Sequence, residues 1–221
     1  MNLSEQTVSI LKNFSTINQN LLVKPGNVLN TMSAMKNIVA KAEVEEEFPS
    51  EFAIYDLNEF LSAMSLFDKP NLEFAENYVV MSETGSKGKK LKYWFSDPSV
   101  VMTPNKELTM PSEEVKFPLQ NNVLSEVQKA AAVIGAPDMV LESGELRVTD
   151  KKNDTANSYS TELDAESESS NYKFWFKVEN LKLLPGCYDV KVSSKQISHF
   201  QNKKLPIGYY IALEPESSYG N

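Results

Sequence analysis

The chain is poor in the side chains on which most catalytic and metal sites depend. It contains one cysteine, Cys187, and one histidine, His199. A single thiol excludes an internal disulfide and is typical of a reducing cytoplasm. One residue of each kind cannot build a metal cage, and neither lies in a nucleophilic triad motif. We therefore expect no enzyme, no metal and no cofactor, with Cys187 packed at a strand start and His199 in a surface loop.

Long apolar runs and glycine-rich phosphate motifs are also missing. No stretch approaches the roughly 18 apolar residues of a membrane span, and neither a P-loop nor GxGxxG occurs. The opening MNLSEQTVSI places Glu5 where an export signal carries lysines. These absences predict an intracellular protein without a membrane partner.

Arginine is nearly absent, which bears on nucleic-acid recognition. The formal charge is −8, from 30 acidic and 22 basic residues, and Arg147 is the single arginine. Base reading relies on the forked guanidinium, so sequence-specific DNA binding is disfavoured. Contacts between lysine and phosphate remain possible and would not depend on sequence. The acidic runs at 43–51 and 162–168 are interpreted as solvated surfaces.

What the sequence does contain is one pattern that occurs twice. An amphipathic helix pattern at 4–18 precedes strand patterns and a short apolar helix at 53–67. A second helix pattern at 119–134 precedes strand patterns and a second short segment at 174–186. The offsets nearly agree, at 117 between Ile17 and Ile134 and at 121 between Leu57 and Val178. The pattern predicts two similar tandem α+β domains.

Local signals place the elements of both halves. Ser4 and Asp56 are expected to cap the first two helices, and Gly135 to end the third. Ser143-Gly144 is expected to turn a hairpin. The remaining strand patterns lie at 20–24, 27–33, 36–44, 71–75, 77–82, 89–95, 115–119, 138–142, 145–149, 187–193 and 207–214, with one further strand near Tyr159. The predicted domains are 1–103 and 115–221, joined by the proline-containing connector 104–114.

Five segments in a fixed order resemble a known family. They are LKNFSTINQN (11–20), AIYDLNEFL (53–61), DPSVV..PNK (97–106), PGCYDVKV (185–192) and YYIALEPES (209–217). Together they resemble the sliding clamps of large tailed bacteriophages, and the resemblance runs from Leu3 to the C-terminus. It implies a homotrimeric ring with helices lining the channel and antiparallel sheets outside. Such a ring encircles duplex DNA without sequence preference and tethers the phage DNA polymerase.

The resemblance also implies an ATP-driven clamp loader as a partner and the cytoplasm of the infected host cell as the location.

From the same resemblance we assign DNA-facing residues on and beside the helices. They are Lys12, Lys129, Lys69, Lys182, Asn13, Thr16 and Gln128. These helices carry few basic residues, and the neutral donors are expected to share the contacts through water.

Two further surfaces follow from the same resemblance. Ring closure requires sheet edges, for which 89–95 with Tyr93 and Trp94 and 159–163 with Tyr159 and Thr161 are the candidates. The alternative for the first is an internal strand with Trp94 buried. A pocket for partner peptides is assigned to Leu108, Met110, Pro111, Leu213 and Pro215, with these side chains expected at the surface.

Two other classes remain as alternatives. A phage structural protein of the baseplate or tail would oligomerise without retaining DNA. A single-stranded DNA binder would need aromatic residues interleaved with basic ones, which only 89–95 offers.

Overall fold

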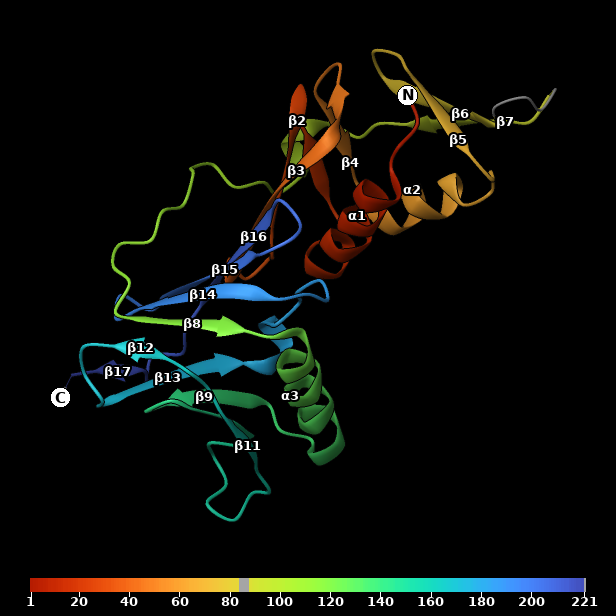
Figure 1. The fold of residues 1–221 in the computed structure, drawn as a ribbon. Coiled ribbons are helices and arrows are strands. Elements are labelled where there is room, and N and C mark those ends of the chain that lie inside the picture. The colour runs from red at the N-terminus through yellow and green to blue at the C-terminus, as the bar shows by residue number, and fades with distance from the viewer. Residues whose placement is uncertain (84–87, 221) are drawn as a thin grey trace. The chain divides into compact units, whose positions relative to one another are not determined.

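A computed structural model describes residues 1–83 and 88–220 of the chain. The chain forms two compact units, Met1–Lys106 and Glu107–Asn221. In each unit an α-helix of 13 or 14 residues accompanies antiparallel strands (Figure 1), so the predicted α+β class is confirmed. The division falls inside the predicted connector, whose limits stay a prediction. No helix of the described residues is both long and apolar enough to span a membrane.

In the first unit, two helices lie side by side (Figure 1). The elements are α1 (Glu5–Ile17), β1 (Leu21–Val23), β2 (Gly26–Met32), β3 (Ile38–Phe48), β4 (Phe52–Ile54), α2 (Leu57–Met64), β5 (Pro70–Phe74), β6 (Tyr78–Glu83), β7 (Lys90–Trp94) and the 3₁₀ turn η1 (Pro98–Val100). Strand β1 pairs with β4, β2 with β3, and β6 with both β5 and β7. The predicted short helix at 53–67 is confirmed at its centre, although its first two residues belong to β4.

The predicted caps of both helices are confirmed. The Ser4 side chain accepts a hydrogen bond from the Thr7 backbone N–H, and that of Asp56 accepts from Asn58 and Glu59. The start of α1 has a second acceptor that is distant in sequence. The Glu46 carboxylate on β3 accepts hydrogen bonds from the Ser4 backbone and the Thr7 hydroxyl. A negative group at this end also complements the helix dipole.

Replacing Glu46 by glutamine is expected to lower the free energy of unfolding by about 1 kcal/mol at neutral pH. Burial raises the pKa of the Glu46 carboxyl, but hydrogen bonds from Thr7 and Ser4 outweigh it and hold the pKa below its ordinary value. Such a group stabilises the fold above its unfolded-state pKa, and this contribution is lost as pH falls through the folded-state pKa.

The difference between wild type and Glu46→Gln should therefore shrink in acid. Urea unfolding at a series of pH values measures it, with Glu47→Gln, an exposed neighbour on β3, as the control. A difference that stays constant down to acid pH would contradict the role assigned to the carboxylate.

In the second unit, one helix lies against a sheet (Figure 1). The elements are β8 (Val115–Leu119), α3 (Asn121–Ile134), β9 (Asp138–Glu142), β10 (Glu145–Thr149), β11 (Tyr159–Glu162), β12 (Glu166–Ser167), β13 (Tyr172–Lys177), the 3₁₀ turn η2 (Val178–Asn180), β14 (Tyr188–Ser193), β15 (Ile197–Asn202), β16 (Ile207–Ala212) and β17 (Ser218–Tyr219). The strand order is β11-β10-β9-β13-β17 in the sheet beside α3, and β12-β8-β14-β15-β16 in the other. The Ser143-Gly144 hairpin is confirmed, and both of its turn residues have positive φ.

The predicted second short helix at 174–186 is wrong. Phe174, Trp175 and Phe176 belong to β13 and are buried on a strand that pairs with β9. Only the three residues of η2 are helical, and 181–187 are irregular. Two buried tyrosines hold this segment: Tyr209 Oη accepts from the Leu184 N–H at 3.2 Å, and Tyr188 Oη donates to the Leu184 carbonyl at 2.5 Å.

The expectation of a surface loop around His199 is also wrong. His199 lies on β15 between Lys191 of β14 and Tyr210 of β16, and its ring stacks on Tyr210 at a centroid distance of 4.4 Å. Burial, together with the Lys191 charge, lowers the pKa of His199, with Glu113 opposing this effect. Cys187 lies just before β14, and its thiol is 3.3 Å from the Gln120 side-chain carbonyl oxygen.

Candidate nucleic-acid interface and subunit edges

The exposed face of α1 carries little charge. The buried face holds Thr7, Ile10, Leu11, Phe14 and Ile17. The opposite face presents Glu5, Ser9, Lys12 and Thr16, all exposed, while Asn13 is half-buried at its side. The structure thus places Lys12 and Thr16 together on one solvent-facing surface, as the sequence predicted. One cation and one carboxylate share it with two hydroxyl groups.

Helix α3 has a similar exposed face. Its buried side is formed by Leu124, Val127 and Ala131, and Val123 and Ile134 are half-buried. The helix begins at Asn121, since Leu119 of the predicted range 119–134 belongs to β8. The exposed side presents Asn122, Ser125, Glu126, Lys129 and Val133, of which Val133 is 77% exposed.

Gln128 lies at the border of the α3 face. It is half-buried, and its side-chain amide donates to the Leu181 carbonyl at 2.9 Å. It therefore joins α3 to the segment after η2, and only its remaining polar atoms are available to a ligand. No sequence pattern indicated the hydrogen bond between Gln128 and Leu181, which are 53 positions apart.

Charge on the helices is close to balanced. Lys12 faces outward beside Glu5 on α1, and Lys129 beside Glu126 on α3. No described carboxylate forms an ion pair with either lysine. Isolated ammonium groups among neutral donors can contact phosphates weakly, and such phosphate contacts carry no sequence information.

The two weaker candidates lie outside the helices. Lys69 is exposed in the turn between α2 and β5. Lys182 is half-buried in the irregular segment after η2, since the short helix predicted there does not form. Neither residue belongs to the exposed face of α1 or α3.

Strand β7 is an edge strand among the described residues, pairing with β6 alone. Its Trp94 is 62% exposed, which excludes the alternative of a buried internal tryptophan. Tyr93 points the other way, stacking edge-on to Phe60 of α2 at 5.3 Å and donating to the Asp56 carbonyl at 3.3 Å. Burial, with the Glu59 and Asp56 charges, raises the pKa of Tyr93 to about 12.

Strand β11 forms the corresponding edge in the second unit. Within the described chain it pairs with β10 alone. Tyr159 turns toward α3, where its hydroxyl donates to the Glu126 carboxylate at 3.4 Å, and Thr161 shares its half-buried side. Both candidate edges therefore direct a tyrosine at a helix of their own unit and leave main-chain groups unpaired.

The five pocket candidates do not form one exposed surface. Pro111 and Pro215 are exposed and Leu108 and Met110 half-buried. Leu213 was predicted to be exposed and is 7% exposed, with its backbone N–H donating to the Gln196 carbonyl. Leu213 continues the period-two alternation of the buried Ile207, Tyr209 and Ile211 in the predicted strand 207–214, so the sequence pattern already indicated a core position.

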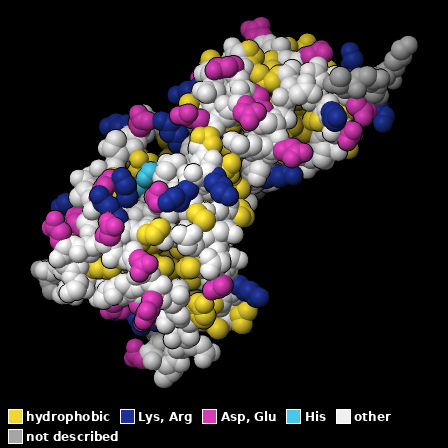
Figure 2. Space-filling model, viewed as in Figure 1, with side chains coloured by type: hydrophobic (Ala, Val, Ile, Leu, Met, Phe, Trp, Pro, Cys, Tyr) yellow, Lys and Arg dark blue, Asp and Glu magenta, His cyan; other side chains and the backbone are white. Residues whose placement is uncertain are grey.

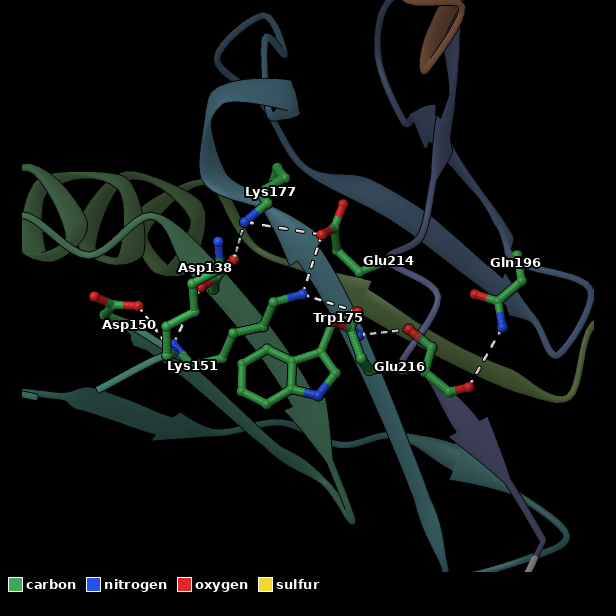
Figure 3. Close-up of polar contacts among 10 residues, drawn as sticks. Asp138, Asp150, Lys151, Trp175, Lys177, Gln196, Glu214 and Glu216 are labelled. Atoms are coloured by element: carbon green, nitrogen blue, oxygen red, sulfur yellow. Dashed lines mark hydrogen bonds and ion pairs between the residues drawn. The ribbon is translucent and has the colours of Figure 1, made fainter. Parts of the chain in front are cut away.

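The segment that bears Leu213 and Pro215 is fixed by a charge network (Figure 3). Lys151 Nζ lies 3.0 Å from a Glu214 carboxylate oxygen and 2.9 Å from one of Glu216. Lys177 Nζ lies 2.6 Å from Asp138 Oδ1 and 3.8 Å from Glu214. The network thus ties the C-terminal segment to β9 and β13.

On the face drawn in Figure 2, acidic and basic side chains are intermingled. Among residues 1–83 and 88–220, no group of three histidine, cysteine or acidic side chains is placed to hold a metal ion.

The known proteins whose sequences resemble this chain belong to one family. The family model described as "DNA polymerase processivity factor" matches residues 4–102. A protein named "Sliding clamp" from Vibrio phage KVP40 is 32% identical over 223 residues, covering 97% of this chain and 99% of that protein. The sliding clamp of Escherichia phage RB69 is 28% identical, covering 99% of each.

Solved structures share the fold at low identity. The proliferating cell nuclear antigen of Thermococcus kodakaraensis superposes with a TM-score of 0.71 at 16% identity, covering 97% of this chain and 99% of that one. The Helicobacter pylori beta clamp bound to a DNA ligase peptide gives 0.64 at 14% identity, covering 100% of this chain and 68% of that one.

Proposed function

Because the chain belongs to the sliding clamp family of DNA polymerase processivity factors, we propose that three copies close head-to-tail into a ring around duplex DNA. The protein encircles DNA and tethers the replicative polymerase for processive synthesis. One observation carries this function: a phage sliding clamp matches the chain from end to end at 32% identity. The two tandem α+β units agree with the architecture that the resemblance implied.

The DNA contacts are proposed to be weak and independent of sequence. Lys12 and Lys129 contact phosphates from the exposed helix faces, and Lys69 and Lys182 add contacts from neighbouring segments. Asn13 and Gln128 contribute neutral donors, and Thr16, whose hydroxyl donates to the Asn13 carbonyl at 2.7 Å, contributes through a bridging water. A ring holds DNA by enclosing it, so high affinity is unnecessary, and the acids beside both helix lysines limit it.

Three further features belong to the same proposal. A closed ring cannot thread onto circular DNA, so an ATP-driven loader must open it. The protein itself has no catalytic activity, since its task is to tether an enzyme. It acts in the infected host cell, in the cytoplasm where the phage genome is copied.

A partner peptide is proposed to bind near the connector. Leu108, Met110, Pro111 and Pro215 supply accessible apolar side chains, while Leu213 is buried. The beta clamp whose structure holds a DNA ligase peptide offers a parallel.

Retention on DNA tests the ring. The protein is loaded with its loader and ATP onto a nicked circular plasmid, and onto the same plasmid after linearisation. We expect retention on the circle in high salt and loss from the linear form, with retention restored when the ends are blocked by bound protein. Equal loss from both forms, with a loader shown to hydrolyse ATP on DNA, would remove the encircling mechanism and favour a structural phage protein.

A further inference from the structure

The three-residue turn between β14 and β15, at 194–196, contacts two segments that are distant in sequence. On one side, the Glu114 carboxylate accepts hydrogen bonds from the Ser194 backbone N–H at 3.1 Å and from its hydroxyl at 2.6 Å. On the other side, the Gln196 backbone carbonyl accepts from the Leu213 N–H at 3.0 Å, and the Gln196 side-chain amide donates to the Ser217 carbonyl at 3.3 Å (Figure 3). One short turn therefore holds both the end of the connector and the C-terminal segment.

The end of the connector is held at successive residues. Ser112 Oγ lies 2.6 Å from the Oγ of the fully buried Ser193, the last residue of β14. Glu113 forms an ion pair with Lys191 of β14 at 2.7 Å. These residues follow directly after Pro111, so the anchors also restrict the position of this proposed peptide-binding residue.

The central acceptor of the connector is a charged group. Burial raises the pKa of the Glu114 carboxyl, but hydrogen bonds from Ser194 and Ser112 outweigh it and hold the pKa below its ordinary value. The carboxylate is therefore ionised at neutral pH, and hydrogen bonds to an ionised acceptor are stronger than those between neutral groups. The turn itself is fixed by the Lys195 N–H, which donates to Ser193 Oγ at 3.1 Å.

The C-terminal segment is also held by β13. The Glu214 N–H donates to the Trp175 carbonyl at 2.8 Å, and the Trp175 N–H donates to Ser217 Oγ at 2.8 Å. The Ser217 N–H donates to the Glu214 carbonyl at 3.1 Å and closes a turn that contains the exposed Pro215. Gln196 completes this attachment from the direction of β15.

We propose that Ser194 and Gln196 are positioning residues of the peptide site, which hold its two segments at a fixed separation. The inference rests on the proposed peptide site near the connector. Two residues of chain span at most about 7 Å, so the turn brings its two points of attachment close together. The two side chains act without touching the peptide. When an anchor is lost, its segment populates other arrangements, and the apparent affinity falls with the fraction that remains competent to bind.

The conformation of Gln196 provides an informative variant. Its φ is 63°, in the left-handed region that residues other than glycine rarely adopt. Glycine would adopt this conformation without strain and would keep the carbonyl that accepts from Leu213, but it lacks the amide that donates to Ser217. Gln196→Gly therefore removes one anchor while leaving the backbone of the turn in place.

Peptide binding tests the positioning role. Labelled peptides that together span the cognate phage DNA polymerase are titrated with the full-length protein by fluorescence anisotropy, and the tightest binder is used for the variants. Glu114→Ala and Gln196→Gly are each expected to raise its Kd about 10-fold, mainly through slower association. The urea midpoint of Gln196→Gly should equal that of wild type, which a merely structural loss would not allow.

Two matched variants serve as controls. Ser194→Thr keeps both donors to Glu114 and should bind with wild-type affinity. Lys195→Ala removes an exposed side chain from the same turn and should also bind normally. Where Glu114→Ala lowers the urea midpoint, Ser194→Ala replaces it, because it removes only the hydroxyl donor and leaves the backbone hydrogen bond.

Hydrogen exchange of the protein without peptide gives an independent measurement. Glu114→Ala should speed exchange of the amides in 107–114, and Gln196→Gly should speed exchange in 213–217. Wild-type affinity in both anchor variants, or exchange that does not change in these segments, would overturn the positioning role alone. A wild-type protein that binds none of the polymerase peptides would overturn the proposed peptide site itself.

Discussion

Replacing Asp138 by alanine is expected to lower the free energy of unfolding of the second unit by about 3 kcal/mol. Asp138 is 1% exposed, and its carboxylate accepts hydrogen bonds from the Lys177 ammonium at 2.6 Å and from the Lys151 backbone N–H at 3.1 Å. Alanine would leave a half-buried cation and a backbone donor without these acceptors. Glu214, whose carboxylate lies 3.8 Å from Lys177 Nζ, remains as a partner for this cation in the variant. The expected loss of free energy of unfolding is therefore at the lower end of the range for breaking a buried ion pair.

Tryptophan fluorescence can follow the second unit alone. The chain has one tryptophan in each unit, so Trp94→Phe leaves Trp175 as the reporter, beside the Lys151 network. The control is Asp189→Ala, which removes an exposed ion pair with Lys203 at 3.0 Å and should cost less than about 1 kcal/mol. Equal urea midpoints for the two alanine variants would contradict a structural role for Asp138.

Reversing the two helix lysines together is expected to reduce loading onto DNA at least ~10-fold. In Lys12→Glu with Lys129→Glu, both exposed helix faces change from near neutrality to net negative charge. Association depends on the attraction between lysine and phosphate, so the reversal replaces attraction by repulsion. Retention on a closed circle should change much less, because enclosure does not depend on affinity.

The measurement separates loading from retention. Clamp bound to nicked circles is counted after a fixed loading time with loader and ATP, and its loss is then followed after the loader is removed. The pair K195E/K204E carries the same charge change away from the helices and should load normally. Unchanged loading by the helix variant would show that Lys12 and Lys129 do not face DNA.

Where the sequence signal was local, the fold followed from it. The spacing of Ile10, Phe14 and Ile17 together with the Ser4 cap was sufficient for α1, and the positive-φ pair Ser143-Gly144 for the hairpin. The outward position of Lys12 follows from the same spacing. Short strand patterns placed β7 and β11 themselves, whereas their role as edges was inferred from the family resemblance.

Where partners are distant in sequence, local patterns were insufficient. The apolar run Phe174–Phe176 suits a buried helix or a buried strand equally, and pairing with β9 decides between them. The hydrogen bonds from Gln128 to Leu181 and from Thr7 to Glu46 join residues 53 and 39 positions apart.

The sparse charge of the α1 and α3 faces has a consequence for motion. On a surface dense with cations, the attraction to each successive phosphate would create a separate energy minimum along the duplex. The clamp would then have to cross a barrier each time it moved to the next phosphate. In the proposed ring, each helix face brings one ammonium and one carboxylate to the duplex, which would give a shallow energy profile along DNA. The one-dimensional diffusion coefficient of the loaded protein should then vary little with ionic strength, in contrast to proteins that bind DNA through many phosphate contacts.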